Sequence, residues 1–374
     1  MKLYRLTILA IIILLLSNTG ASAEWLRSIV AGSSYLENPF HYNGSAPLFN
    51  HTIALQLGNN PANSNMTYNY SGNYSLLSQL STGSLTDNSF QLGYSNHLDE
   101  NRKLVLNLSS AVGMGLNSTE YTVYDNYSLG VAGAMNYSIS ETSIARMGTK
   151  ALYKSFYNSS SLSYADMVAY LGYKTYFETE TSLNAELNIG QKNYGVSLMR
   201  LAGKGQYESA SGQSASQIVV NIKAAQSLAE KTGLSLLYSQ SWNLSTNDQT
   251  RKAFNPELIF DKDIYDDPYS YQSKELTATL TQYFSNEYKA QLSAFYSDKV
   301  YSYSSDLSNS SSAAPRSDIS SGFSISLQKK ITEEFLFFNS AQINLGYQYM
   351  FNSSNSDMFR YKDNEIGLSA RFNF

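Results

Sequence analysis

Histidine and cysteine set the limits of the chemistry open to this chain of 374 residues, which has 3 histidines and no cysteine. No disulfide, thiol nucleophile or cysteine-bound metal is possible. His97 is close to Asp99 in sequence, but both fall at a short turn where solvated charge is expected. His41 and His51 have no serine or carboxylate at a recognisable spacing, and no hydrolase, metalloprotease or phosphate-loop motif occurs. We therefore expect no catalytic residue and no enzyme.

The most acidic segment, residues 261–267, contains Asp261, Asp263, Asp266 and Asp267. Several carboxylates could attract calcium, but the glycine and the distal glutamate of a calcium-binding loop are missing. We interpret the segment as a solvated acidic loop, and we expect no metal and no cofactor. The long link around it could instead fold inward as a constriction, or simply cover the surface.

Composition excludes two further classes. The formal net charge is −4, so there is no basic footprint for nucleic acid, and no nucleic-acid partner is expected. The hydrophobic content of 43% is too high for a disordered chain with so small a net charge. The 31 tyrosines, beside abundant serine and asparagine, suit a protein that is wet on one face and apolar on the other.

Hydrophobic residues alternate with period two along most of the chain, which is the pattern of β-strands rather than helices. Over residues 128–140 one parity reads Leu129, Val131, Gly133, Met135, Tyr137, Ile139, and the other reads Gly130, Ala132, Ala134, Asn136, Ser138, Ser140. Such segments run about 10–14 residues, whereas globular strands usually run about 5–6 and membrane-spanning strands about 9–11. The pattern predicts an all-β, transmembrane, antiparallel up-and-down barrel, because a sheet in lipid must close.

The expected links between strands alternate in length. Short links fall at 98–101, 141–143, 176–180, 227–232 and 285–287, with a slightly longer one from 329 to about 335. Longer links fall at 117–127, about 195–212, 243–270, 301–316 and 351–363. Short turns at one end and long loops at the other are typical of outer-membrane barrels.

Counting back from Phe374 gives fourteen strands, the first starting near Asn65. A further pair at about 33–41 and 47–58 makes sixteen, although Pro39 lies inside the first of the two. We favour sixteen strands, with fourteen as the alternative. Residues 24–374 then form a single barrel domain.

The first residues have the layout of a secretory signal. Lys2 and Arg5 precede an apolar run over residues 6–16, and Ala21-Ser22-Ala23 follows. Eleven apolar residues are too few to span a bilayer as a helix, which needs roughly 20. We expect residues 1–23 to be a cleavable signal peptide.

The last ten residues place Ile366, Leu368, Ala370, Phe372 and Phe374 on one face. A closing strand that ends in phenylalanine resembles the assembly signal of Gram-negative outer-membrane β-barrel proteins. The resemblance implies that Phe372 and Phe374 are recognised by the barrel-assembly machinery. It also implies location in the outer membrane, with its lipids and lipopolysaccharide as partners.

The C-terminal strands also weakly resemble the barrel of the surface lipoprotein assembly modifiers, over about 28 residues. That family carries a TPR-like helical domain that is not found in this sequence, so lipoprotein translocation is not carried over.

The polar parity of the expected strands is rich in small residues and should line the interior. A barrel of about sixteen strands can enclose an aqueous channel. Ten charged residues share this parity and are the candidate lumen-lining residues: Arg146, Lys150, Lys154, Asp166, Glu186, Lys192, Lys223, Glu275, Lys289 and Arg371. Both signs occur, so ion selectivity stays open, and opposite charges could simply pair across neighbouring strands.

Aromatic residues flank the short turns and should form an interfacial girdle. They are Tyr170, Tyr173, Tyr176, Phe177, Tyr283, Phe284, Tyr288 and Tyr296.

Three functions remain. We favour a porin-like outer-membrane channel for passive diffusion of small hydrophilic solutes. The alternative is a surface-exposed barrel for binding, assembly or export with a plugged lumen, and a hydrolase active at the barrel rim is a minor alternative. The identity of the solute or partner and the oligomeric state stay open.

Overall fold

The structure is a computed structural model that describes residues 25–39, 41, 43–59, 64–78, 84–195, 214–245, 266–302, 314–332 and 338–374. Sixteen antiparallel strands form one closed barrel, in which each strand pairs with its sequence neighbours and β1 pairs with β16. The predicted fold class and the favoured count of sixteen strands are confirmed. Within the described ranges no helix is long and apolar enough to cross a membrane.

The strands are 12–16 residues long, as the alternating pattern predicts for a sheet that crosses a bilayer. Their bounds are β1 Trp25–Leu36, β2 Leu48–Asn59, β3 Met66–Leu77, β4 Ser84–His97, β5 Leu104–Asn117, β6 Asn126–Ser138, β7 Ser143–Phe156, β8 Tyr164–Tyr176, β9 Thr181–Tyr194, β10 Ser214–Ala229, β11 Thr232–Ser245, β12 Tyr271–Tyr283, β13 Tyr288–Tyr301, β14 Ser317–Ile331, β15 Ser340–Ser354 and β16 Tyr361–Asn373.

The register keeps one parity of every strand on the same side of the sheet. Ala132 pairs with Lys150, and Lys150 pairs with Val168, so this row lies on one face across three strands. The neighbouring row on the opposite face is apolar, and in it Val131 is 52% exposed and Met167 58% exposed. Exposed apolar side chains lie on the outer parity of β2–β16, which suits contact with lipid.

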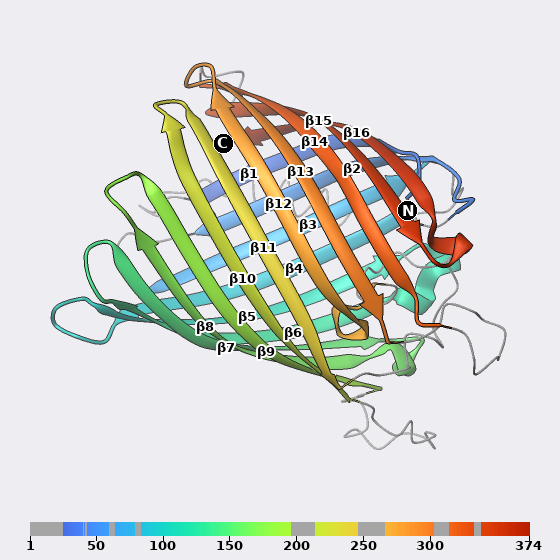
Figure 1. Ribbon diagram of the computed structural model, residues 1–374, viewed down its shortest axis with the longest axis horizontal. Helices are drawn as coiled ribbons and strands as arrows, with labels where there is room; N and C mark the ends of the chain where they lie inside the picture. The colour runs from blue at the N-terminus through green and yellow to red at the C-terminus, as the bar shows by residue number, and fades with distance from the viewer. Residues whose placement is uncertain are drawn as a thin grey trace.

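The links divide between the two ends of the barrel as expected. Figure 1 shows the short β4–β5, β6–β7, β8–β9, β10–β11 and β12–β13 turns gathered at one end, and the short 3-10 helices at the other. These helices are η1 Thr119–Tyr124, η2 Ser160–Leu162, η5 Pro268–Ser270 and η6 Asp357–Phe359. We call the end that carries the 3-10 helices the mouth.

The first strand departs from the prediction. β1 begins by Trp25 and ends at Leu36, so the predicted range of 33–41 was wrong. Pro39 lies outside the strand because proline has no N–H to donate to the ladder. Residues 1–23 lie outside the described residues, and the signal peptide stays a prediction.

The aromatic girdle was also predicted too broadly. Tyr173, Tyr288 and Tyr296 are exposed on the outer parity, but Tyr170 lies on the inner parity. The phenol of Tyr170 fills the space beside Gly148, where a Cβ would lie 2.6 Å from its hydroxyl. The Arg146 guanidinium lies 5.2 Å from the ring centroid. Tyr176 and Tyr283 share the inner parity at strand ends, so proximity to a turn did not decide which way these side chains point.

Candidate functional site

All ten predicted lumen-lining residues fall on the inner parity of the barrel. The continuous row through Arg146, Gly172 and Glu186 fixes the inner face of β7–β9, and the neighbouring pairs extend it around the sheet. Lys150, Lys154, Asp166, Lys192, Lys223, Glu275, Lys289 and Arg371 occupy equivalent positions. Their ion pairs and their exposure decide which of them can contact a solute.

One sector of the inner face is strongly basic. The strands β7–β10 direct six basic and only two acidic side chains inward, and we call this sector the basic wall. The basic residues are Arg146, Lys150, Lys154, Lys174, Lys192 and Lys223, and the acidic ones are Asp166 and Glu186. Lys174 has the same parity but was not among the ten predicted lumen-lining residues, although its position in β8 places it on the polar parity.

The sector of β12–β16 has balanced charge, and we call it the balanced wall. Its inward acidic residues are Glu275, Asp318, Asp363 and Glu365, and its inward basic residues are Lys289, Lys299, Lys330 and Arg371. Lys299 and Asp318 were missed by sequence reasoning, although both lie on the polar parity of their strands. The strands of both walls therefore alternate inner and outer side chains in the same way, but the two walls differ in net charge.

Some of the basic wall is already paired. Arg146 forms an ion pair with Glu186, reaching across β8 at Gly172, which has no side chain to block it. The alternative that inner charges pair with one another therefore holds for these two residues. Lys150 and Lys223 are exposed on the same inner face.

Residues 266–270 fold inward at the mouth against the inner faces of β8–β13, and we call this segment the mouth strap. Its two adjacent carboxylates bind different walls, one at β9 and the other at β13. Asp267 accepts hydrogen bonds from Lys192 at 3.1 Å and from Tyr194 at 2.5 Å on β9. Asp266 accepts from Lys299 at 2.6 Å and from Tyr301 at 2.8 Å on β13.

Side chains of two further strands hold the strap backbone. Gln217 donates from its Nε2 to the carbonyl oxygen of Pro268 at 2.6 Å, and Asn243 donates from its Nδ2 to that of Tyr269 at 3.1 Å. Asp267 is 1% exposed and Lys192 3% exposed. The interpretation of residues 261–267 as a solvated loop was wrong for Asp266 and Asp267, because burial among basic partners replaces their water. Asp261 and Asp263 lie outside the described residues.

The strap reaches the inner face of β8 through Tyr269, whose hydroxyl donates to Asp166 at 2.6 Å. The Tyr269 phenol lies against Gly190, where a Cβ would clash with it. Burial, followed by the hydrogen bond to Asp166 and its charge, raises the pKa of Tyr269 above its ordinary value. Asp166 and Lys192 thus lie on the inner face as predicted, but they contact the strap.

Asp266 is held ionised by its surroundings. Burial acts to raise the pKa of its carboxyl, but the Lys299 charge, the hydrogen bonds from Lys299 and Tyr301 and the Arg316 charge lower the pKa below its ordinary value. The carboxylate is therefore present at neutral pH and keeps the strap bound to β13.

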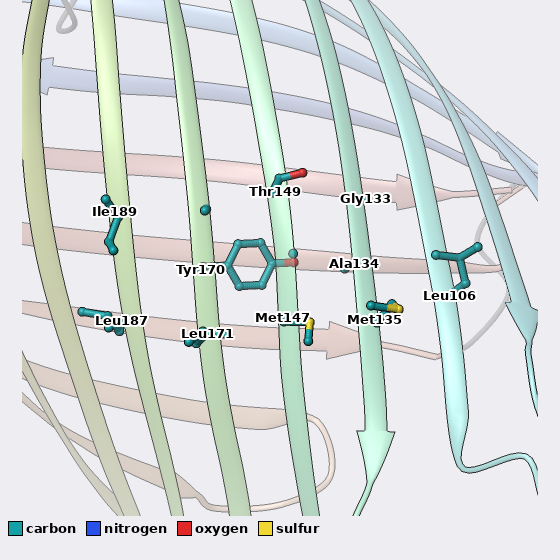
Figure 2. Close-up of a pocket in the computed structure, with 12 residues that line it drawn as sticks. Leu106, Gly133, Ala134, Met135, Met147, Thr149, Tyr170, Leu171, Leu187 and Ile189 are labelled. Atoms are coloured by element: carbon teal, nitrogen blue, oxygen red, sulfur yellow. The ribbon is translucent and has the colours of Figure 1, made fainter.

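One apolar hollow lies on the outer surface of the barrel and not in the lumen. A depression of about 530 Å³ lies over the outer side of β5–β9, where Gly133, Thr149 and Ala169 leave room between larger side chains. Figure 2 shows this depression with Leu106, Met135, Met147, Leu171, Leu187 and Ile189 around it. Apart from Thr149, the side chains on its outer side are apolar, so the inner face remains the candidate site.

The histidines do not assemble a catalytic group. His97 ends β4 at the short-turn end, whereas His41 lies near the mouth with its Nδ1 3.8 Å from Asp363. His51 lies on the outer parity of β2. Among the described residues, no group of three histidines or carboxylates could hold a metal ion.

At the C-terminus the aromatic residues meet near the short-turn end. The Phe338 ring lies 4.8 Å from that of Phe372 and 5.9 Å from that of Phe374. The backbone N–H of Phe374 donates to Arg27 at 3.1 Å and extends the β16–β1 seam that closes the barrel.

No protein-family model and no curated protein sequence matches this chain. Solved structures do match. OccAB1 from Acinetobacter baumannii superposes with a TM-score of 0.53 at 10% identity, over 94% of this chain and 96% of that chain. The outer membrane protein opdK from Pseudomonas aeruginosa gives a TM-score of 0.51 at 8% identity, over 94% and 99%. The chain therefore has the fold of the Gram-negative outer-membrane porins.

Proposed function

We propose that the protein is a non-enzymatic, porin-like channel in the outer membrane that admits small hydrophilic solutes by passive diffusion. The observation that carries the proposal is the inner face, where small polar residues and exposed bases such as Lys150 and Lys223 line a closed sixteen-stranded barrel. Barrels of this strand number are wide enough to hold water. The structural neighbours are substrate-specific porins of the OprD/Occ group, which supports the same function.

Eight of the ten predicted lumen-lining residues keep that role in the proposal. Lys150, Lys154, Lys223, Lys289 and Arg371 supply positive charge to the path, and Glu275 supplies negative charge. Arg146 and Glu186 present a neutralised pair. Asp166 and Lys192 instead hold the mouth strap.

Planar-bilayer recording tests the channel directly. Purified protein whose folding has been verified by heat-modifiability on a gel should give discrete conductance steps. The same folded preparation without any step would exclude an open channel.

The mouth strap favours one alternative, a plugged barrel that binds or assembles partners at the surface. In that case folded wild-type protein would not conduct, and the double variant Asp266→Asn/Asp267→Asn, which frees the strap from both walls, would conduct. Conductance in the wild type argues against the plug.

The aromatic C-terminus supports assembly by the barrel-insertion machinery into a membrane of lipids and lipopolysaccharide. Truncation of the Phe374 side chain by Phe374→Ala should lower the fraction of protein assembled in outer-membrane fractions. Phe338→Ala is the matched control, because Phe338 packs on Phe372 and Phe374 without belonging to the last strand. An equal defect in both variants would mean that Phe374 acts through packing.

A further inference from the structure

The hollow over the outer side of β5–β9 is one part of a longer groove. A second hollow of about 780 Å³ lies beside it on the same surface. The two hollows share Gly133, Thr149, Ala169 and Ile189. These residues are direct partners from strand to strand and form one row across β6–β9, which we call the groove floor.

Larger side chains form the two walls of the groove. The wall nearer the short turns holds Met135, Met147 and Leu171, which Figure 2 shows. The wall nearer the mouth holds Val131 and Met167. The lining atoms of such a depression lose van der Waals contacts unless another molecule fills it, and methionine side chains are flexible enough to adapt to that molecule.

The groove rises from the middle of the barrel toward the mouth. Gly133 lies five residues from the short-turn end of β6 at Ser138, whereas Ile189 lies eight residues from the short-turn end of β9 at Thr181. The second hollow continues over β10, where it reaches Ser216, two residues from the mouth end of that strand. The groove is therefore inclined, because a row at right angles to tilted strands changes its depth from strand to strand.

The chemistry of the groove changes along this slope. Apolar side chains such as Leu106 and Met135 line its deep end, and Gln191 and Ser216 line its mouth-side end. Gln191 donates a hydrogen bond to Asn193 at 3.3 Å, so amide groups gather there. No outward side chain within the strands β5–β11 is charged. The groove is thus apolar along its length and ends in uncharged hydrogen-bonding groups.

We propose that the groove holds one acyl chain of a membrane lipid, with the carbonyl of the chain at Gln191 and Ser216 and its methyl end near Gly133. The groove is continuous with the outer surface that faces lipid. From β6 to β10 it crosses four strand spacings, about 19 Å. This length suits a tilted chain, since the chains of one leaflet fill half of a hydrocarbon core of about 30 Å.

The shape of the groove argues against the other molecules that could cover a lipid-facing surface. On β8 the two walls are Leu171 and Met167, four residues apart, which is about 14 Å between Cα atoms before their side chains narrow the gap. A transmembrane helix is about 10–12 Å across with its side chains and does not fit. A second copy of the closed barrel presents a convex surface, which cannot enter a groove.

Photo-crosslinking in vesicles tests both the position and the direction of the chain. The barrel is reconstituted in phosphatidylcholine with a trace of a phosphatidylcholine that carries a diazirine in one acyl chain, near either the carbonyl or the methyl end. Mass spectrometry then locates the crosslinks. The carbonyl-end probe should mark Gln191 and Ser216, and the methyl-end probe should mark Gly133 and Met135. Each should exceed outward residues of β13 at the same depth by about fivefold, because a chain packed against a floor and two walls gains van der Waals contacts.

Ala169→Phe fills the groove floor midway and should remove both enrichments. Ala294→Phe is the matched control, because Ala294 also lies mid-strand on the outer parity, in β13, and pairs with Phe323. It should leave the labelling of the groove unchanged. Both substitutions add an apolar side chain that faces lipid, so heat-modifiability should show that both variants fold.

Equal labelling of the groove and of β13 in the wild type would mean that lipid covers the barrel uniformly, and would overturn the site. Enrichment that survives Ala169→Phe would also overturn it, because the floor would not hold the chain. Labelling of the groove below that of β13 would show that another protein chain covers this face, contrary to the proposal. Crosslinking needs no open lumen, so the result is independent of the channel.

Discussion

The basic wall and the balanced wall follow one rule of alternation, yet they differ in charge. The inner parity of β7–β10 has six basic and two acidic residues, whereas that of β12–β16 has four of each. Both patterns are compatible with the barrel, because the fold requires only that inner side chains tolerate water. The fold therefore leaves the sign of the inner charges free to differ between the two walls.

The mouth strap connects the two walls through neighbouring carboxylates. Asp267 neutralises Lys192 on the basic wall, and Asp266 neutralises Lys299 on the balanced wall. The first pair is almost fully buried, with side chains 4% and 1% exposed, whereas the second is 17% and 15% exposed. The strap should therefore depend more on its contact with the basic wall.

The largest effect is expected from Asp267→Ala. Removal of one partner of a buried ion pair costs about 3–5 kcal/mol, so the strap should leave β9 and allow water to reach Lys192. Amine labelling followed by mass spectrometry should modify Lys192 in the variant and leave it protected in the wild type. Asp357→Ala is the control, because Asp357 is 87% exposed and its pair with Arg360 is worth at most about 1 kcal/mol. Equal labelling of Lys192 in all three proteins would mean that the strap is not docked.

The next effect compares inner and outer positions on both walls. Leu187 lies in β9, a strand of the basic wall, and Ile325 lies in β14, a strand of the balanced wall. Both are mid-strand on the outer parity. Arginine at either position should cost about 2–4 kcal/mol because it faces lipid. Their neighbours Asn188 and Ser324 face the lumen, where arginine should cost little. Unfolding in urea, followed by gel mobility, measures the difference, and equal costs at both parities would contradict the barrel orientation.

The same outer positions can be probed without changing charge. Spin labels at 187 and 325 should be quenched from the lipid phase, and labels at 188 and 324 should not. Equal protection at all four would mean that neither parity meets lipid.

The sequence alone was sufficient for the barrel because the alternation repeats in most strands and does not depend on distant contacts. It also assigned residues such as Lys150, Lys223 and Glu275 to the polar parity, since parity is a local property. The start of β1 was not predicted, because its first residues lie next to the signal-like segment. The predicted strand also extended too far toward the C-terminus, because it included Pro39.

An inward fold of this link was one of the alternatives that the sequence left open, but the contacts of the mouth strap could not be predicted, because they join residues far apart in sequence. Tyr269 and Asp166 are separated by 103 positions, and Asp267 and Lys192 by 75. A run of aspartates normally indicates a solvated segment. Only the closed barrel brings Lys192 and Lys299 to the two neighbouring aspartates of the strap. Tyr170 was misassigned for a related reason, since the space that its ring fills is created by Gly148 on the next strand.

A smaller effect is expected from neutralising exposed bases of the basic wall. In water a unit charge about 10 Å from a passing ion contributes roughly 0.4 kcal/mol, or about a twofold preference. Lys150→Gln/Lys223→Gln should therefore shift the ion preference toward cations by about fourfold, measured as the reversal potential in a salt gradient. Lys103→Gln/Lys231→Gln, at short turns, is the matched control with the same change of net charge. An equal shift in the two double variants would remove the basic wall as the cause.

The smallest effect is the acid sensitivity of the strap on the balanced wall. Lys299 and its neighbours lower the pKa of Asp266 below the ordinary aspartate value, which is about 3.9. A lowered carboxyl pKa in the folded state gives stability that is fully present above the ordinary pKa and is lost as pH falls through the folded value. Docking to β13 should thus be independent of pH from neutrality to about pH 5 and weaken only below about pH 4.

Asp266→Asn separates this contribution from the other acid-sensitive groups of the protein. The difference in the free energy of unfolding between wild type and variant should be constant above about pH 5 and shrink toward zero below about pH 4. Urea titrations at several pH values measure it. A difference that stays constant down to the most acidic pH would show that the Asp266 charge does not hold the strap, and that Tyr301 and the strap backbone contacts suffice. The contrast between the two walls would then rest on Asp267 and Lys192 alone.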